Sequence, residues 1–313
     1  MRHKNIRRLI KLKFVHTIIK GSKKVKLPGF EGLSLYVVSK FFFHGMINGS
    51  LNMRASSLAF SFFLALFPSI IFLFTLIPYI PIEDFQDSLF NLMQTVLPKA
   101  AFEATEETII DIIKNPHGGL LSFGFISALY FSTNGFTAMI NAFNETYHKM
   151  ETRTALAQRL ISLGMVIIST LLVSVAIALI VFTELISTEY IHVGFISNFF
   201  LHFGKYVILI ALCLCFISMN YHLGPKEKGK FRFVTPGSIL ATVLTIIASL
   251  LFAYYVNHFG SYNKLYGSIG TLIVVMMWIY IVSLILLLGF DLNVSIKMAK
   301  KKHKRTVQFT EIG

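Results

Sequence analysis

The amino-acid sequence predicts an all-α, polytopic integral membrane protein with six transmembrane helices and both termini in the cytoplasm. Hydrophobic residues make up 55% of the 313 residues and charged residues only 14%, whereas a soluble domain carries about 25% charged residues. The charges gather in short blocks between long uncharged runs. Several of these runs reach the roughly 20 apolar residues that a helix needs to cross the hydrocarbon core of a bilayer.

Six segments qualify as spans by their length and lack of charge. In chain order they cover residues 55–79, 119–144, 160–182, 206–223, 233–257 and 265–290. The fourth is the least secure by composition, because His202 and Lys205 lie beside its start.

The basic residues orient these spans. Residues 1–54 contain twelve Lys or Arg residues and one acid, and the segments after the second, fourth and sixth spans are also basic. The segment between the first two spans instead holds seven acids and two lysines. Because cytoplasmic loops carry an excess of Lys and Arg, six spans with both ends inside satisfy the alternation. The net charge of +14 is then mostly a topology signal. We expect membrane lipids as partners of the basic arm and no nucleic acid.

Three regions follow from this topology. Residues 1–50 form a basic cytoplasmic arm, in which 33–47 is predicted to be an amphipathic helix on the membrane surface. Residues 51–298 form the membrane domain, with an external helical hairpin at 83–114 that either caps the span ends or acts as a lid over an outward cavity. Residues 299–313 form a basic cytoplasmic tail. The sequence does not define an oligomeric state.

The second span carries a polar face. Its members recur every three or four residues: Asn134, Thr137, Asn141, Asn144 or Glu145, and His148. Amides directed toward lipid are costly, so this face must meet other helices or water. Two interpretations remain open, a structural hydrogen-bond seam between helices and a surface that lines a substrate pathway.

Two charges flank the membrane domain at the same predicted interface. Arg54 opens the first span and Asp291 closes the sixth. Charges near lipid are usually paired, so we predict an ion pair of Arg54 with Asp291 or with Glu145. The competing interpretation is that Arg54 reaches the headgroups by itself.

Two further features concern packing and openings. Ser57, Ser61 and Ala65 follow the small-xxx-small spacing that favours close helix contact. Residues 259–267 are predicted to form an external turn in which Tyr262 and Tyr266 either anchor the chain at the interface or line an outward opening.

Three motifs resemble those of the YihY/virulence factor BrkB family, in the expected order over about residues 35–298. They are residues 54–68 (RASSLAFSFFLALFP), the second-span stretches 119–124, 132–135 and 141–147, and residues 262–270 with Trp278 and 289–293 (GFDLN). Asn293 in the last motif joins the candidate functional polar residues. The resemblance implies a bacterial cytoplasmic-membrane protein without an agreed activity. The older family label, ribonuclease BN, is regarded as a misassignment.

A transporter or exporter of a solute or lipid is the leading functional hypothesis, and a membrane scaffold or assembly factor is the alternative. No phosphate-binding loop is present, and no cofactor or metal is expected. The sequence argues against an enzyme, because its cytoplasmic acids are scattered and its histidines lack metal-site spacing, whereas nuclease metals need clustered ligands. The two cysteines, Cys213 and Cys215, lie in an apolar run and form no disulfide framework or metal site.

Overall fold

A computed structural model describes residues 20–23, 25, 29–48, 50–79, 110–111, 115–146, 153–189, 195–226, 232–258 and 261–311. Several helix ends are described by their backbone alone. Within these ranges every regular element is helical, so the all-α prediction is confirmed for this part of the chain. The elements are α2 (Leu35–Asn48), α3 (Leu51–Leu76) with the 3-10 turn η1 (Ile77–Tyr79), α6 (Gly118–Thr146), α7 (Ala155–Glu189), α8 (Phe195–Leu223), α9 (Pro236–His258) and α10 (Ser261–Glu311).

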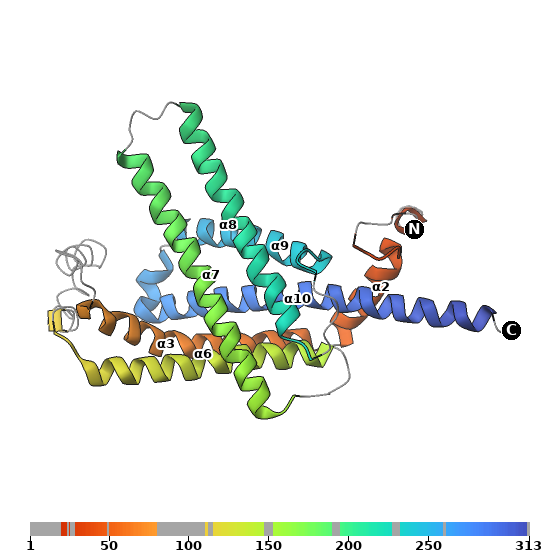
Figure 1. The fold of residues 1–313 in the computed structure, drawn as a ribbon, viewed down its shortest axis with the longest axis horizontal. Helices are drawn as coiled ribbons and strands as arrows, with labels where there is room; N and C mark the ends of the chain where they lie inside the picture. Colours follow the sequence, from red (N-terminus) through yellow and green to blue (C-terminus); the bar gives the residue numbers. More distant parts are fainter. Residues whose placement is uncertain are drawn as a thin grey trace, which may run out of the picture.

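Five of the described helices contain a segment long and apolar enough to cross a membrane. These segments are Leu51–Tyr79, Ala155–Ile180, Phe203–Leu223, Pro236–Val256 and Leu272–Lys302. α6, which corresponds to the predicted second span, does not reach this level of hydropathy because glycines and three asparagines interrupt its apolar residues. It nevertheless lies antiparallel beside α3 along most of its length (Figure 1).

Small residues let α3 and α6 approach each other. On α3, Ala55 and Ala59 are fully buried. On α6, a Cβ added to Gly124 would lie 3.1 Å from the backbone nitrogen of Phe72, and one added to Gly135 would lie 2.9 Å from the ring of Phe62. Of the predicted contact stripe Ser57, Ser61 and Ala65, only Ala65 is buried, because Ser57 is exposed and Ser61 half-buried. The buried face of α3 near its start is formed by Leu51, Ala55, Leu58 and Ala59, together with Arg54.

Two glycines bring the backbones of α9 and α10 close together. A Cβ on Gly237 would lie 2.0 Å from the carbonyl oxygen of Gly289, and one on Gly289 would lie 2.4 Å from the hydroxyl of Tyr221. No side chain fits at either position. These two glycines therefore set the distance between α9 and α10.

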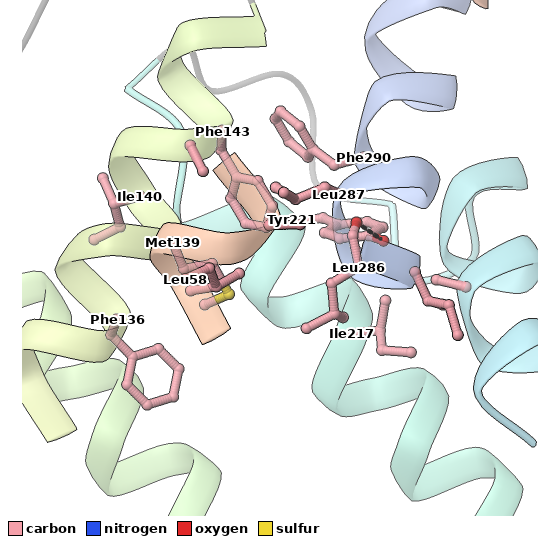
Figure 2. Packing of buried hydrophobic residues seen from close by; sticks show 14 of the residues in the cluster. Leu58, Phe136, Met139, Ile140, Phe143, Ile217, Tyr221, Leu286, Leu287 and Phe290 are labelled. Atoms are coloured by element: carbon pink, nitrogen blue, oxygen red, sulfur yellow. Dashed lines mark hydrogen bonds between the residues drawn. The ribbon is translucent and has the colours of Figure 1, made fainter. Parts of the chain in front are cut away.

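The main hydrophobic core lies where α3, α6, α8 and α10 meet. Phe143, Tyr221 and Phe290 come from three different helices and form one aromatic cluster there (Figure 2). The rings of Phe143 and Phe290 stack with centroids 4.2 Å apart, and Tyr221 meets both edge-on. The Tyr221 hydroxyl donates to the Leu286 carbonyl at 2.7 Å, so its polar group is satisfied inside the core.

α10 is much longer than a membrane span. Its 51 residues correspond to about 77 Å at 1.5 Å per residue, so the predicted tail continues the helix to Glu311. α2, the predicted amphipathic helix, docks on this extension through Val38 of α2 and Ile296 and Ala299 of α10. The predicted turn at 259–267 is wrong from Ser261 onward, because α10 begins there and the single Gly267 does not interrupt it.

α7 and α8 form an antiparallel pair that crosses the other helices diagonally and extends away from them (Figure 1). Their outward positions carry large exposed apolar side chains, among them Leu171, Val175 and Ile208. In water such a surface would be unfavourable, whereas lipid solvates it.

Replacing Gly289 with alanine tests the α9–α10 contact. The added methyl group would collide with backbone and with Tyr221, and overpacking of this kind costs about 1–3 kcal/mol. Gly164→Ala is the matched control, because Gly164 lies within α7 with nothing within 4 Å of an added Cβ, and alanine in a helix is favoured by about 1 kcal/mol. The free energy of unfolding, measured by reversible unfolding in mixed micelles, should be lower for Gly289→Ala than for wild type. For Gly164→Ala it should equal or exceed the wild-type value. Equal stability of the two variants would contradict the contact.

Candidate functional site

A buried polar cluster joins α3, α6 and α10 at one end of the bundle. Arg54 from the first turn of α3 is 5% exposed and Asp291 of α10 is 3% exposed. Arg54 Nη2 lies 3.0 Å from Asp291 Oδ2, and Nη1 lies 3.5 Å from Oδ1. The predicted ion pair between Arg54 and Asp291 is therefore present. The alternative partner, Glu145, is exposed.

α6 completes the cluster through its last turn. The Thr146 hydroxyl donates to Asp291 Oδ1 at 2.8 Å, and Arg54 Nη1 donates to the Ala142 carbonyl at 2.9 Å and to the Thr146 hydroxyl. Arg54, Thr146 and Asp291 are called the Arg54 cluster below. Removing two charges from water is expensive, and the cost is offset only when the remaining polar atoms are also bonded. This cluster meets that condition.

The polar face of α6 meets α7. Asn141 Oδ1 accepts from Gln158 at 2.7 Å, and Thr137 shares a 2.9 Å hydrogen bond with Ser162. Asn134 accepts a short hydrogen bond from Arg159. These contacts agree with the seam interpretation of this face, and a role in lining a pathway stays a prediction.

Arg159 brings a positive charge to the middle of α6. Its guanidinium also donates to the Thr133 hydroxyl at 3.3 Å and lies over the ring of Tyr130, 5.0 Å from the centroid. A cation over a tyrosine face is attracted by the ring's negative surface. Sequence reasoning assigned Arg159 to the orientation signal alone, so this contact was not predicted.

Asn144 and Asn293 act as links between segments. Asn144 Oδ1 accepts from the backbone nitrogen of Lys226 at 3.1 Å. Asn293 Oδ1 accepts from the backbone nitrogen of Gly237 at 2.8 Å, and its amide donates to the Thr235 hydroxyl at 2.9 Å. Asn293 therefore satisfies one of the free N–H groups at the start of α9, the task of a capping residue.

Two predicted features lie where the structure describes little. Tyr262 and Tyr266 fall in the first turns of α10, and only their backbone is described. The predicted hairpin at 83–114 lies outside the described residues except for Ile110 and Asp111. Among the described residues no group of three or more His, Cys, Asp or Glu side chains could hold a metal ion.

A second ionic cluster ties the N-terminal turn to the segment just before α9 and to α10. Glu31 lies in a turn with φ of 53° between Gly29 and Gly32, both also at positive φ. Its carboxylate contacts Lys300 Nζ at 2.5 Å and Arg232 Nη1 at 3.0 Å. The hydrogen bond from Lys300, with the charges of Lys300 and Arg232, holds the pKa of Glu31 below its usual value against an opposing effect of burial.

Comparison with known proteins places this arrangement in a family. The family model described as virulence factor BrkB matches residues 42–310. The chain belongs to the BrkB family.

Several bacterial relatives share most of this chain. The ribonuclease-like protein YfkH of Bacillus subtilis (strain 168) is 34% identical over 251 residues, which cover 79% of this chain and 90% of YfkH. A UPF0761 membrane protein of Haemophilus influenzae (strain 86-028NP), NTHI0384, is 23% identical and matches 83% of this chain and 95% of its own length. Smlt0865 of Stenotrophomonas maltophilia (strain K279a), another UPF0761 membrane protein, is 25% identical over 82% of this chain and 60% of its own length. No solved structure matches.

The sequence did not reveal several hydrogen-bonding residues of this BrkB-family chain that lie outside the predicted polar face of α6. Thr146 follows Glu145 directly and was not among the predicted polar residues. It lies one helical turn after Ala142, and its hydroxyl also contacts the Ala142 carbonyl. Gln158 and Ser162 are four residues apart and hence on one face of α7, which is the signal that would have identified them. Arg153 donates to the carbonyls of Gly224 and Pro225, just past the end of α8.

Asp291→Ala should destabilise the BrkB-family chain by about 3–5 kcal/mol, because it leaves the Arg54 charge buried without its partner. Glu145→Ala removes a carboxylate at an exposed position nearby and should change stability by less than about 0.5 kcal/mol. The double variant Arg54→Met with Asp291→Leu should recover part of the loss, since no lone charge remains buried. Detergent-based unfolding measures all three. Equal losses of unfolding free energy in Asp291→Ala and Glu145→Ala would disprove a stabilising pair.

The contacts of Glu31 should make the stability of the folded protein depend on pH. Because the folded-state pKa of Glu31 is lowered, its contribution is present above the ordinary carboxyl range and is lost as pH falls through the lowered value. Wild type should therefore exceed Glu31→Gln in melting temperature at pH 7, with the difference disappearing on acidification. Glu145→Gln, which neutralises an exposed acid, is the control and should show no such convergence. A difference that persists unchanged below the carboxyl range would contradict the assignment.

Proposed function

We propose that this BrkB-family protein is a six-span protein of the bacterial cytoplasmic membrane that moves a solute or amphipathic lipid across it. In this topology α6 is the second of the six spans, and the acidic segment before it faces outward. The basic segments before α3, α7 and α9 and the end of α10 face the cytoplasm, in accord with the positive-inside rule. The pairing of α6 with α3 along most of its length supports this count, since the partner helix is itself a candidate span.

The Arg54 cluster is the single observation that carries the proposal. Ionisable residues buried within spanning helices are costly and are commonly functional. Here one ion pair couples three helices at the proposed cytoplasmic end. A pair of this kind is a discrete contact that is either made or broken, which is the property that a switch between two helix arrangements needs. Asp291 is the acid that a proton-coupled cycle would use.

The alternative is a membrane scaffold or assembly factor, and the α6–α7 seam favours it. The polar side chains of α6 that would line a pathway already form hydrogen bonds with Gln158, Arg159 and Ser162 of α7. A scaffold needs one packed arrangement, whereas transport by alternating access needs at least two. An enzymatic role is not proposed, and the ribonuclease-like name belongs to the relative YfkH.

Distances between α3 and α10 in lipid nanodiscs distinguish the two functions. Spin labels at Met53→Cys and Lys301→Cys, both exposed positions, in a chain with Cys213→Ala and Cys215→Ala, report on the Arg54 cluster by pulsed electron paramagnetic resonance. Transport predicts two distance populations, with Asp291→Asn enriching the longer one. Glu145→Gln is the charge-matched control and should leave the populations unchanged. A single population in wild type and in Asp291→Asn would favour the scaffold.

A further inference from the structure

A cavity of about 360 Å³ lies between the N-terminal turn, the end of α8, the start of α9 and α10. It lies on the opposite side of α10 from the Arg54 cluster. Phe290 and Tyr221 contribute to its inner wall, and both belong to the aromatic cluster of the core. The cavity thus starts at a packed wall and extends toward the basic end of the chain.

The lining has an excess of positive charge. Arg232 and Lys297 line the cavity, and Glu31 is the single acid among its lining residues. The Glu31 carboxylate is already shared between Arg232 and Lys300, so its negative charge is balanced by contacts with the protein. Arg232 is 58% exposed along its side chain and is well placed for exchange with solvent. The cavity therefore favours an anion over a cation.

One buried polar group in the lining has no partner. Ser218 on α8 is 3% exposed and lines the cavity, and its hydroxyl makes no hydrogen bond to any residue that the structure describes. A buried hydroxyl without a partner costs about 1–3 kcal/mol. Such an atom beside a cavity is a candidate hydrogen-bond partner for a group bound there.

The start of α9 adds favourable potential without supplying donors. Its first N–H groups are already bonded to Asn293 Oδ1, to the Thr235 hydroxyl and to the Thr235 carbonyl. The donors for an anion must then come from Arg232, Lys297 and Ser218. A guanidinium, an ammonium and a hydroxyl together suit the several acceptor oxygens of a phosphate group.

We propose that this cavity binds a phosphate group. Val234, Phe290 and Ile296 give the same cavity an apolar side, which would accommodate the hydrocarbon part of a lipid or an organic phosphate. The phosphate belongs either to an anionic phospholipid headgroup or to a soluble phosphate compound. The site does not depend on whether the chain transports anything, and lipid access to it rests on the topology proposed above.

Binding of two probes to the full chain tests the site. The first is inorganic phosphate added to protein in uncharged detergent, and the second is phosphatidylglycerol compared with phosphatidylcholine by native mass spectrometry. Ser218→Ala and Lys297→Gln should each weaken binding by about tenfold to a hundredfold, the effect of losing one hydrogen bond to a charged group. Lys301→Gln removes the same charge from an exposed position of α10 outside the lining and should leave binding within about twofold.

Ser218→Ala separates a ligand contact from a structural one. Because the hydroxyl has no partner among the described residues, its removal should leave the melting temperature of the ligand-free protein unchanged or raised while binding weakens. Phosphatidylglycerol binding without phosphate binding assigns a lipid headgroup, and binding of both assigns the phosphate itself. Binding of neither probe overturns the site. So does binding that Ser218→Ala leaves unchanged, or that Lys301→Gln weakens as much as Lys297→Gln.

Discussion

A guanidinium and a carboxylate that are almost completely removed from solvent hold three helices together. The pair is tolerable in an apolar setting only because Thr146 and the Ala142 carbonyl complete its hydrogen bonds. This requirement fixes the position of α3 and α6 along each other. With Arg54 held at the end of α6, Gly135 meets Phe62 and Gly124 meets Phe72 further along the pair. A shift of α3 by one turn along α6 would break the ion pair. It would also place larger side chains against each other at the contacts that Gly124 and Gly135 now make.

The stretch Gly289–Asn293 shows how one helical turn serves two neighbours. Gly289 and Asn293 are four residues apart, so they lie on nearly the same face of α10. That face meets α9, through close backbone contact at Gly289 and capping by Asn293. Asp291 lies about 200° around the helix from Gly289 at 100° per residue and faces α3 and α6. The alternation of small, charged and amide residues in this motif follows from the two different partners.

The sequence was sufficient to predict the helices and one ion pair. The apolar segments predicted the helices, and the placement of Arg54 at the start of the first predicted span and of Asp291 at the end of the sixth predicted their pair. Features that depend on which helix faces which could not be predicted. Gln158 and Arg159 follow a basic segment, and their partners on α6 depend on the diagonal crossing of α7. The role of Asn293 as a cap for α9 depends on the close approach at Gly237, which no local pattern encodes.

These contacts also divide the bundle into bodies that could move. α9 cannot leave α10 without exposing the Gly237 N–H group that Asn293 satisfies and opening the Gly237–Gly289 contact. α2 is joined to α10 by a separate apolar cluster and by Glu31. α3 and α6 are joined along their length by alanines and glycines. Between the α2–α9–α10 group and the α3–α6 pair, the Arg54 cluster forms a polar link, reinforced by the aromatic stacking of Phe143 on Phe290. Phe290 also forms part of the wall of the phosphate cavity. A group bound in that cavity would therefore contact the same turn of α10 that holds Asp291, which gives the two sites a short physical path for coupling.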